Sequence, residues 1–260
     1  MDKIGLVTTI RDDQLLLLNK ENATFAPPSR RPSPLYLLSF HRDRILAAAQ
    51  AAGRSCKELE GDKGLELLAC KIQSHRKSAN RDVEDALKVR IVLSASNALD
   101  VTSTLVPSTP QSALFPKSLS EIFKSKPTYR IYISPIKTKP SLYTRFKTTE
   151  RSAYDKVRSV LPKSNPDSLL TEILLINEKG DIMEGSFTTP YFNHGGWITP
   201  AKSSGGNLGV TRRWALGKGL CEEGLVNMNS VQAGSLGERI ILSNGARGFG
   251  WGRVEPLVDL

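Results

Sequence analysis

The sequence predicts an α+β protein built as two lobes. Short apolar stretches with strand-like alternation outnumber long helical patterns. The stretch 107–127 is rich in Pro and Ser and contains no long periodic element, so it is the best candidate for an interdomain connection. We therefore expect a smaller N-terminal domain at 1–126 and a C-terminal domain at 127–260. A chain of 260 residues is long enough to bury a core in each.

The first lobe opens with residues 4–18, which predict a strand, a turn at Asp12 and Asp13, and a second strand. The apolar residues of 40–52 recur at helical spacing, and Gly53 can end that helix. The other expected elements of this lobe are a Pro-rich loop at 22–34, a helix within 57–77, and strands at 88–94 and 101–106.

In the second lobe, the pattern of 150–161 predicts a helix that Pro162 ends. Residues 171–177 and the following EKGDIMEG and SFTTPYF segments predict strands joined by a Gly turn. A Gly-rich loop at 203–209 leads into a helix that begins near Thr211. The other expected strands are 128–134, 197–199 and 239–243.

Composition narrows the class of protein. With 39% hydrophobic residues, the chain is neither wholly disordered nor collagen-like. Three cysteines without CxxC or CxxH spacing argue against a disulfide framework or a structural zinc site, and no metal site is expected. No apolar run predicts a membrane span and no signal segment is visible, so we expect a cytoplasmic protein. The 36 Lys and Arg against 26 Asp and Glu leave a net charge of +10, which fits a nucleic acid, an anionic surface or a small anionic ligand.

Three segments carry chemistry. The loop at 203–209 and the helix start at Thr211 have the geometry of a phosphate site, with backbone N–H groups, a helix dipole and a hydroxyl. Lys147 lies among other cations, which lower the pKa of a lysine as a Schiff base requires. Glu184 precedes a Gly turn. Alone, each has a simpler interpretation, namely a flexible loop, a surface lysine and a turn acid. Together they are the parts that pyridoxal phosphate demands.

The chain resembles the fold-type IV pyridoxal-phosphate enzymes, which include branched-chain and D-amino acid aminotransferases and 4-amino-4-deoxychorismate lyase. The resemblance runs in order over nearly the whole chain, through TTIR (8–11), FHRDRILAAA (40–49), FKTT, MEGSFTT, LGVTRR and ILSNGARG (241–248). It implies a two-lobed fold with a smaller N-terminal α/β lobe, a larger C-terminal lobe with a barrel-like sheet, and the cofactor between them.

The resemblance also assigns roles. It implies that Lys147 is the Schiff-base lysine and that Glu184 binds the pyridine nitrogen. The cofactor phosphate is expected to bind the residues at Arg44, Gly209, Val210, Thr211 and Asn244.

Within the family, the segments around FKTT and SNGARG look most like the lyase, especially its fungal versions. That enzyme is a carbon–oxygen lyase that converts 4-amino-4-deoxychorismate to 4-aminobenzoate and pyruvate, a step toward folate. Its substrate is a dicarboxylate, so we expect Arg247 first, and then Arg145, to bind carboxylates, with Thr9 lining the pocket. Phe146 stands where relatives often have His, and Thr188 and Thr189 stand where many have Asn.

Other interpretations stay open. A branched-chain or D-amino acid aminotransferase would use the same lysine, so the catalytic residues do not separate the two reactions. A basic nucleic-acid-binding protein would need aromatic platforms among the cations, and aromatic residues make up only 7% of the chain. We therefore expect a small-molecule substrate, no nucleic acid and no membrane partner. Relatives are usually dimers, which leaves a homodimer open. Tyr154 is expected in the core, His41 in a structural role, and the 75–77 cluster on a solvated surface.

Overall fold

The computed structural model describes residues 4–162, 169–233 and 238–257, and the chain divides into two compact units. Unit 1 comprises Met1–Gln111, Phe146–Glu150 and Gly245–Arg247. Unit 2 comprises Ser112–Arg145, Arg151–Asn244 and Gly248–Leu260. The division thus falls after Gln111, whereas the sequence analysis placed it after residue 126. Two short later segments join unit 1 because they hydrogen-bond to its first strand, through the carbonyl groups of Lys147 and Gly245.

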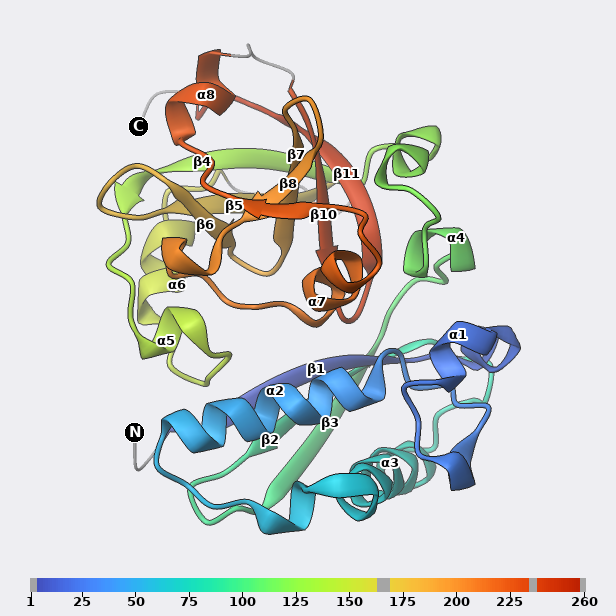
Figure 1. The fold of residues 1–260 in the computed structure, drawn as a ribbon. Coiled ribbons are helices and arrows are strands. Elements are labelled where there is room, and N and C mark those ends of the chain that lie inside the picture. Colours follow the sequence, from blue (N-terminus) through green and yellow to red (C-terminus); the bar gives the residue numbers. More distant parts are fainter. Residues whose placement is uncertain (1–3, 163–168, 234–237, 258–260) are drawn as a thin grey trace. The chain divides into compact units, whose positions relative to one another are not determined.

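Unit 1 is a three-stranded antiparallel sheet with helices on one face (Figure 1). Its strands, in the order β1-β2-β3, are β1 (Leu6–Asp12), β2 (Leu87–Leu93) and β3 (Leu99–Leu105). Its helices are α1 (Lys20–Ala23), α2 (Leu38–Ala51) and α3 (Gly61–Ser78). The helices predicted at 40–52 and within 57–77 and the strands predicted at 88–94 and 101–106 are confirmed. Gly53 follows α2 with a φ of 68°, a conformation that glycine adopts without strain.

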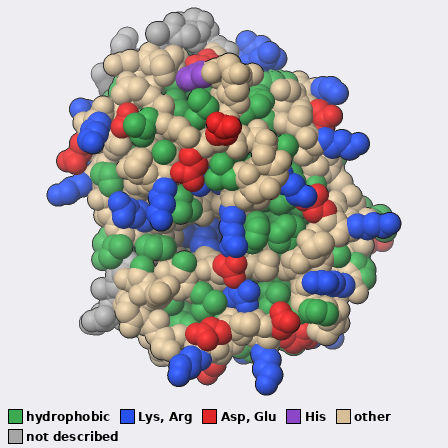
Figure 2. All heavy atoms as spheres, viewed as in Figure 1, with side chains coloured by type: hydrophobic (Ala, Val, Ile, Leu, Met, Phe, Trp, Pro, Cys, Tyr) green, Lys and Arg blue, Asp and Glu red, His purple; other side chains and the backbone are tan. Residues whose placement is uncertain are grey.

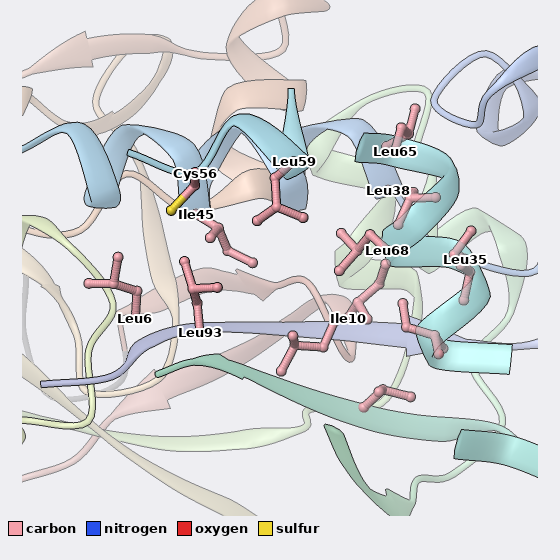
Figure 3. Close-up of a cluster of buried hydrophobic side chains, with 14 of the residues drawn as sticks. Leu6, Ile10, Leu35, Leu38, Ile45, Cys56, Leu59, Leu65, Leu68 and Leu93 are labelled. Atoms are coloured by element: carbon pink, nitrogen blue, oxygen red, sulfur yellow. The ribbon is translucent and has the colours of Figure 1, made fainter. Parts of the chain in front are cut away.

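The core of unit 1 lies between the sheet and α2 and α3 (Figure 3). Figure 3 shows Ile10 of β1, Ile45 of α2 and Leu68 of α3 converging on one apolar cluster. All three side chains are buried almost completely. Burying such a side chain contributes about 1.5–3 kcal/mol relative to leaving it in water. This packing fixes the position of α2 against β1.

The second strand expected within 4–18 is wrong. Residues Gln14–Leu18 form a 3-10 helix, because the side chain of Asp13 accepts a hydrogen bond from the backbone N–H of Leu15 and caps the turn. The apolar side chains of this segment therefore do not share one buried face: Leu16 is buried, while Leu18 is exposed.

The expectation of a solvated cluster at 75–77 is wrong for two of its three residues. Arg76, in the last turn of α3, donates from Nε to the buried Asp12 carboxylate at 2.7 Å and also binds the carbonyl groups of Asp82 and Asp85. His75 Nε2 lies 3.0 Å from Ser103 Oγ. Arg76 thus fastens the end of β1 to the end of α3.

We expect Arg76→Met to lower the free energy of unfolding by about 3 kcal/mol, because it leaves a buried carboxylate without its cation. Asp12→Asn in the same background should restore part of that loss. Urea unfolding followed by circular dichroism measures both effects. The control is Lys77→Met at the neighbouring exposed position, which should change the stability by less than about 0.5 kcal/mol. Equal effects of Arg76→Met and Lys77→Met would contradict a stabilising role for the bond between Arg76 and Asp12.

Unit 2 contains an eight-stranded sheet that curls into a half-barrel (Figure 1), in the order β6-β5-β4-β11-β10-β7-β8-β9. Its strands are β4 (Tyr129–Lys137), β5 (Leu170–Ile176), β6 (Ile182–Gly185), β7 (Thr189–Asn193), β8 (Trp197–Pro200), β9 (Glu222–Gly224), β10 (Arg239–Asn244) and β11 (Gly248–Val254). The helices beyond α3 are α4 (Gln111–Leu114), α5 (Leu142–Arg145), α6 (Ser152–Arg158), α7 (Val210–Gly217) and α8 (Met228–Ala233).

Two apolar clusters stabilise unit 2. One gathers buried residues of β4, β5, β10 and β11, and the other packs Tyr154 and Val157 of α6 against Ile173 and Leu175 of β5. The GFGWG segment is β11, and its glycines serve close packing, since a Cβ at Gly252 would lie 2.3 Å from the Tyr129 carbonyl oxygen.

No helix in residues 4–162, 169–233 and 238–257 is both long and apolar enough to cross a bilayer. The same residues contain no group of three or more His, Cys, Asp or Glu side chains that could hold a metal ion.

Candidate functional site

Lys147 is held by the first strand of unit 1. Its carbonyl oxygen accepts a hydrogen bond from Val7 N at 2.8 Å, and Thr149 N donates to the Gly5 carbonyl at 2.9 Å. These bonds extend the sheet by one short antiparallel segment, with Leu6 opposite Thr148. The backbone is therefore fixed at Lys147 itself and at Thr149, and Lys147 is half-buried.

Arg44 lies on α2, one turn after His41, and both side chains reach the buried Thr8 of β1. Arg44 Nη2 donates to Thr8 Oγ1, and His41 Nδ1 lies 2.7 Å from the same oxygen. Arg44 Nη2 also lies 3.5 Å from His41 Nδ1. Thr8 thus links His41 to Arg44.

Burial and the neighbouring cations keep the His41 imidazole neutral. Burial lowers its pKa well below the ordinary value, and the cations Arg44 and Lys147 lower it further. Burial also lowers the pKa of Arg44 to about 10, which leaves the guanidinium charged at neutral pH. Lys147 therefore acts electrostatically on the same group of residues as Arg44.

Two polar atoms of this cluster, Arg44 Nε and His41 Nε2, are buried and have no hydrogen-bond partner among the described residues. Arg44 Nε can only donate, and an unpaired buried donor costs free energy, so this position points to an anion that would accept from it. A phosphate group has the charge and the acceptor oxygens that such a cluster requires. The residues of unit 1 fit the phosphate end of the cofactor that the sequence motifs predict.

In unit 2, Glu184 lies in β6 itself and is almost fully buried. Its Oε1 accepts from the Tyr154 hydroxyl at 2.7 Å and from the backbone N–H of Asn207 at 3.0 Å. Burial, followed by the nearby Glu184 carboxylate, raises the pKa of Tyr154 far above its ordinary value, so the phenol stays protonated and donates. A carboxylate fixed in this way can hold a positive pyridine nitrogen.

The start of α7 in unit 2 supplies a second group of polar residues. Gly209 is the N-cap, and a Cβ there would lie 2.6 Å from Thr189 Oγ1, so the close approach excludes a side chain. Thr211 is fully buried, with its Oγ1 2.7 Å from Ser243 Oγ, which in turn is 2.9 Å from the Tyr191 hydroxyl. The start of α7, which the sequence predicts as part of the phosphate site, therefore combines a glycine N-cap with a hydroxyl that hydrogen bonds hold in place.

The remaining predicted residues lie in three different places. Asn244 is the last residue of β10, directly after Ser243. Arg247 belongs to the 245–247 segment of unit 1, which the fully buried Arg11 holds by donating to the Ala246 carbonyl. Val210 is the first residue of α7 and is buried.

The other two residues predicted to contact the substrate belong to different units. Arg145 ends helix α5 and belongs to unit 2. Thr9 follows Thr8 on β1, and successive side chains on a strand point to opposite faces. Thr8, which the sequence analysis did not select, is the one bonded to His41 and Arg44.

The hydrogen-bond partners of the predicted site residues were not predicted from the sequence. Tyr154 is buried in the core as predicted, and in addition its hydroxyl binds Glu184. His41, Thr8 and Ser243 were not assigned to the site. The helical spacing of His41 and Arg44, three residues apart, was the one signal in the sequence that pointed to a shared face.

Comparisons with known proteins identify the family. Residues 29–250 match the family model of class IV amino-transferases. The aminodeoxychorismate lyase of Saccharomyces cerevisiae is 32% identical in a 130-residue alignment that covers 44% of this chain and 34% of that protein. The matched segment thus spans about a third of the curated relative.

Solved structures show the same fold. A candidate amino-acid aminotransferase of Mesorhizobium loti has a TM-score of 0.65 at 21% identity, covering 96% of this chain and 99% of the other. The branched-chain amino acid aminotransferase of Escherichia coli has a TM-score of 0.61 at 15% identity, covering 98% and 76%. The 4-amino-4-deoxychorismate lyase of Pseudomonas aeruginosa has a TM-score of 0.58 at 15% identity, covering 98% and 86%.

The family match covers most of the chain, and the buried carboxylate, the cationic cluster with an unpaired donor and the glycine-capped helix start suit the cofactor on which that family depends. The protein belongs to the class IV aminotransferase family of pyridoxal-phosphate-dependent, fold-type IV enzymes.

Proposed function

We propose that the protein is an aminodeoxychorismate lyase, which converts 4-amino-4-deoxychorismate to 4-aminobenzoate and pyruvate. The observation that carries this choice within the family is the 32% identity to the yeast protein of that name. The reaction needs no second substrate, because the atoms of the two products add up to those of the one substrate. It would place the enzyme on the route to folate.

The cofactor roles are divided among residues of this chain. We assign the phosphate to Arg44, Gly209, Val210, Thr211 and Asn244, whose N–H groups and hydroxyl are suited to an anion.

Glu184, with its two donors, is assigned to the pyridine nitrogen. Bound pyridoxal phosphate supplies an aldehyde that reacts with amines and a ring that withdraws electrons.

Lys147 carries the proton transfers in this proposal. Its Nζ would hold the cofactor through the aldehyde, and as a free amine it would take a proton from the substrate carbon that bears nitrogen. The same Nζ returns a proton to the departing enolpyruvyl group. Loss of that group makes the six-membered ring aromatic, which drives the reaction forward.

The substrate carboxylates require cations beyond the cofactor. We assign them to Arg247 first and Arg145 second, with Thr9 lining the pocket. The bonds from Arg11 that fix the 245–247 segment support Arg247 because they give its backbone a defined position.

The partner in this proposal is a small molecule. On the face shown in Figure 2, Lys and Arg side chains occur together with acidic and apolar ones. The low share of aromatic residues, 7% of the chain, supports a small substrate over a nucleic acid. We further propose a cytoplasmic setting, supported by three free cysteines, and a homodimer, as in relatives.

A branched-chain or D-amino acid aminotransferase is the second candidate, favoured by the fold of the Escherichia coli enzyme. The test incubates purified, cofactor-loaded protein with 4-amino-4-deoxychorismate and quantifies 4-aminobenzoate and pyruvate. We expect equal amounts of both. Parallel reactions offer leucine or D-alanine with 2-oxoglutarate. Glutamate formation without any 4-aminobenzoate would overturn the lyase assignment and establish the second candidate.

A further inference from the structure

Glu172 is a buried carboxylate that the proposed chemistry does not use. It lies in β5, and its side chain is 1% exposed. Arg158 is its nearest cation, with Nη1 3.8 Å from Oε1, beyond a direct hydrogen bond. An acid buried this deeply is retained against a desolvation cost, so its hydrogen bonds show what it does.

All four hydrogen bonds to Glu172 come from its own neighbour or from one short turn. Oε1 accepts from Ser186 Oγ at 2.5 Å and from Ile173 N at 2.9 Å. Oε2 accepts from Thr188 Oγ1 at 2.7 Å and from Phe187 N at 3.1 Å. The carboxylate therefore binds the chain at 186, 187 and 188.

This segment, the 185–188 turn, follows Glu184 directly. Gly185 N donates to the Thr188 carbonyl at 2.8 Å, and Ser186 N donates to the Ile173 carbonyl at 3.0 Å. A Cβ at Gly185 would lie 2.4 Å from Thr188 Oγ1 and 3.0 Å from the Glu172 carboxyl carbon. The turn is packed so closely on Glu172 that only glycine fits at its start.

The same turn is tied to the helix that carries Tyr154. Arg158 Nη1 donates to Ser186 Oγ at 2.7 Å, and Arg151 Nη2 donates to the Ser186 carbonyl at 3.0 Å. The Arg151 guanidinium also stacks on Tyr154, 4.4 Å from the ring centre. Glu184 and its hydroxyl donor are thus both fixed by elements that meet at the turn.

We propose that Glu172 is a positioning residue that holds the 185–188 turn and, through it, the Glu184 carboxylate and its Tyr154 donor. The proposal rests on the role assigned to Glu184 at the cofactor nitrogen. An acid is required because each carboxylate oxygen accepts from a backbone N–H, which cannot reverse its polarity. Glutamine would place its NH₂ group against one of them.

The test is a double-mutant cycle read out as the dissociation constant for pyridoxal phosphate. We expect Glu172→Gln to weaken binding about tenfold when Glu184 is present and less than about twofold in a Glu184→Gln background. A role confined to the general stability of unit 2 would weaken binding by the same factor in both backgrounds. The matched control is Glu178→Gln, an exposed acid of the same hairpin, which should leave binding unchanged.

Each remaining outcome has a defined meaning. Equal factors in the two backgrounds, or no effect of Glu172→Gln, would overturn the positioning role while the role of Glu184 stands. No effect of Glu184→Gln would overturn the assignment of Glu184 and the positioning role with it. If Glu172→Gln fails to fold, Thr188→Val removes one donor and keeps the charge. Thr188→Val should weaken cofactor binding about threefold when Glu184 is present and less in the Glu184→Gln background. Wild-type affinity of the Thr188→Val protein would overturn the proposal.

Discussion

Replacing Lys147 by alanine should abolish turnover, with kcat reduced by at least about a thousandfold, because one amine both binds the cofactor and moves the protons. The fold should survive, since the bonds that fix this segment to β1 come from backbone atoms. The variant should also lose the visible absorbance that a lysine-bound cofactor gives. Absorbance spectra and initial rates of 4-aminobenzoate formation measure both effects.

Lys139→Ala is the matched control for Lys147. Lys139 is an exposed lysine eight positions earlier in the same basic stretch. If charge alone mattered, the two variants would behave alike. A Lys147→Ala protein that retains wild-type rates would remove the lysine from the mechanism.

Glu184→Gln should lower kcat by about 10²- to 10⁴-fold. The amide oxygen can still accept from Tyr154 and from Asn207 N, so the local hydrogen bonds persist. What disappears is the negative charge, and with it the preference for a protonated cofactor nitrogen. Steady-state kinetics with both proteins fully loaded with cofactor separate this effect from weaker binding.

Tyr154→Phe is the companion variant, because it removes one donor and keeps the carboxylate. Its loss in kcat should be about tenfold, smaller than that of Glu184→Gln. A larger loss for Tyr154→Phe than for Glu184→Gln would mean that the tyrosine, and not the acid, is the principal group.

The fold type could be predicted from the order of the motifs along the chain. Short segments such as FKTT and MEGSFTT contain the residue types that the cofactor chemistry requires. The secondary-structure prediction was wrong where a local hydrogen bond outweighed the periodicity of the apolar residues. The Leu15–Leu18 run has strand-like composition, but capping by Asp13 turns it into a 3-10 helix.

The partners of the site residues could not be predicted for a different reason. Tyr154 shows a core position by its helical spacing, yet its bond to Glu184 joins residues 30 positions apart. The choice between Thr8 and Thr9 depends on which face of β1 meets α2, and both faces of that strand are largely buried. Glu172 is one acid in an apolar strand, and only the folded turn shows that it accepts four hydrogen bonds.

Reduction of the cofactor-loaded protein with borohydride, followed by peptide mass spectrometry, tests the assignment of Lys147 most directly. Reduction converts a cofactor-bound lysine into a stable pyridoxyl derivative. We expect that mass on the peptide containing Lys147 and on no other lysine. A pyridoxyl group on a different lysine, or no labelled peptide from protein that has bound the cofactor, would contradict the assignment.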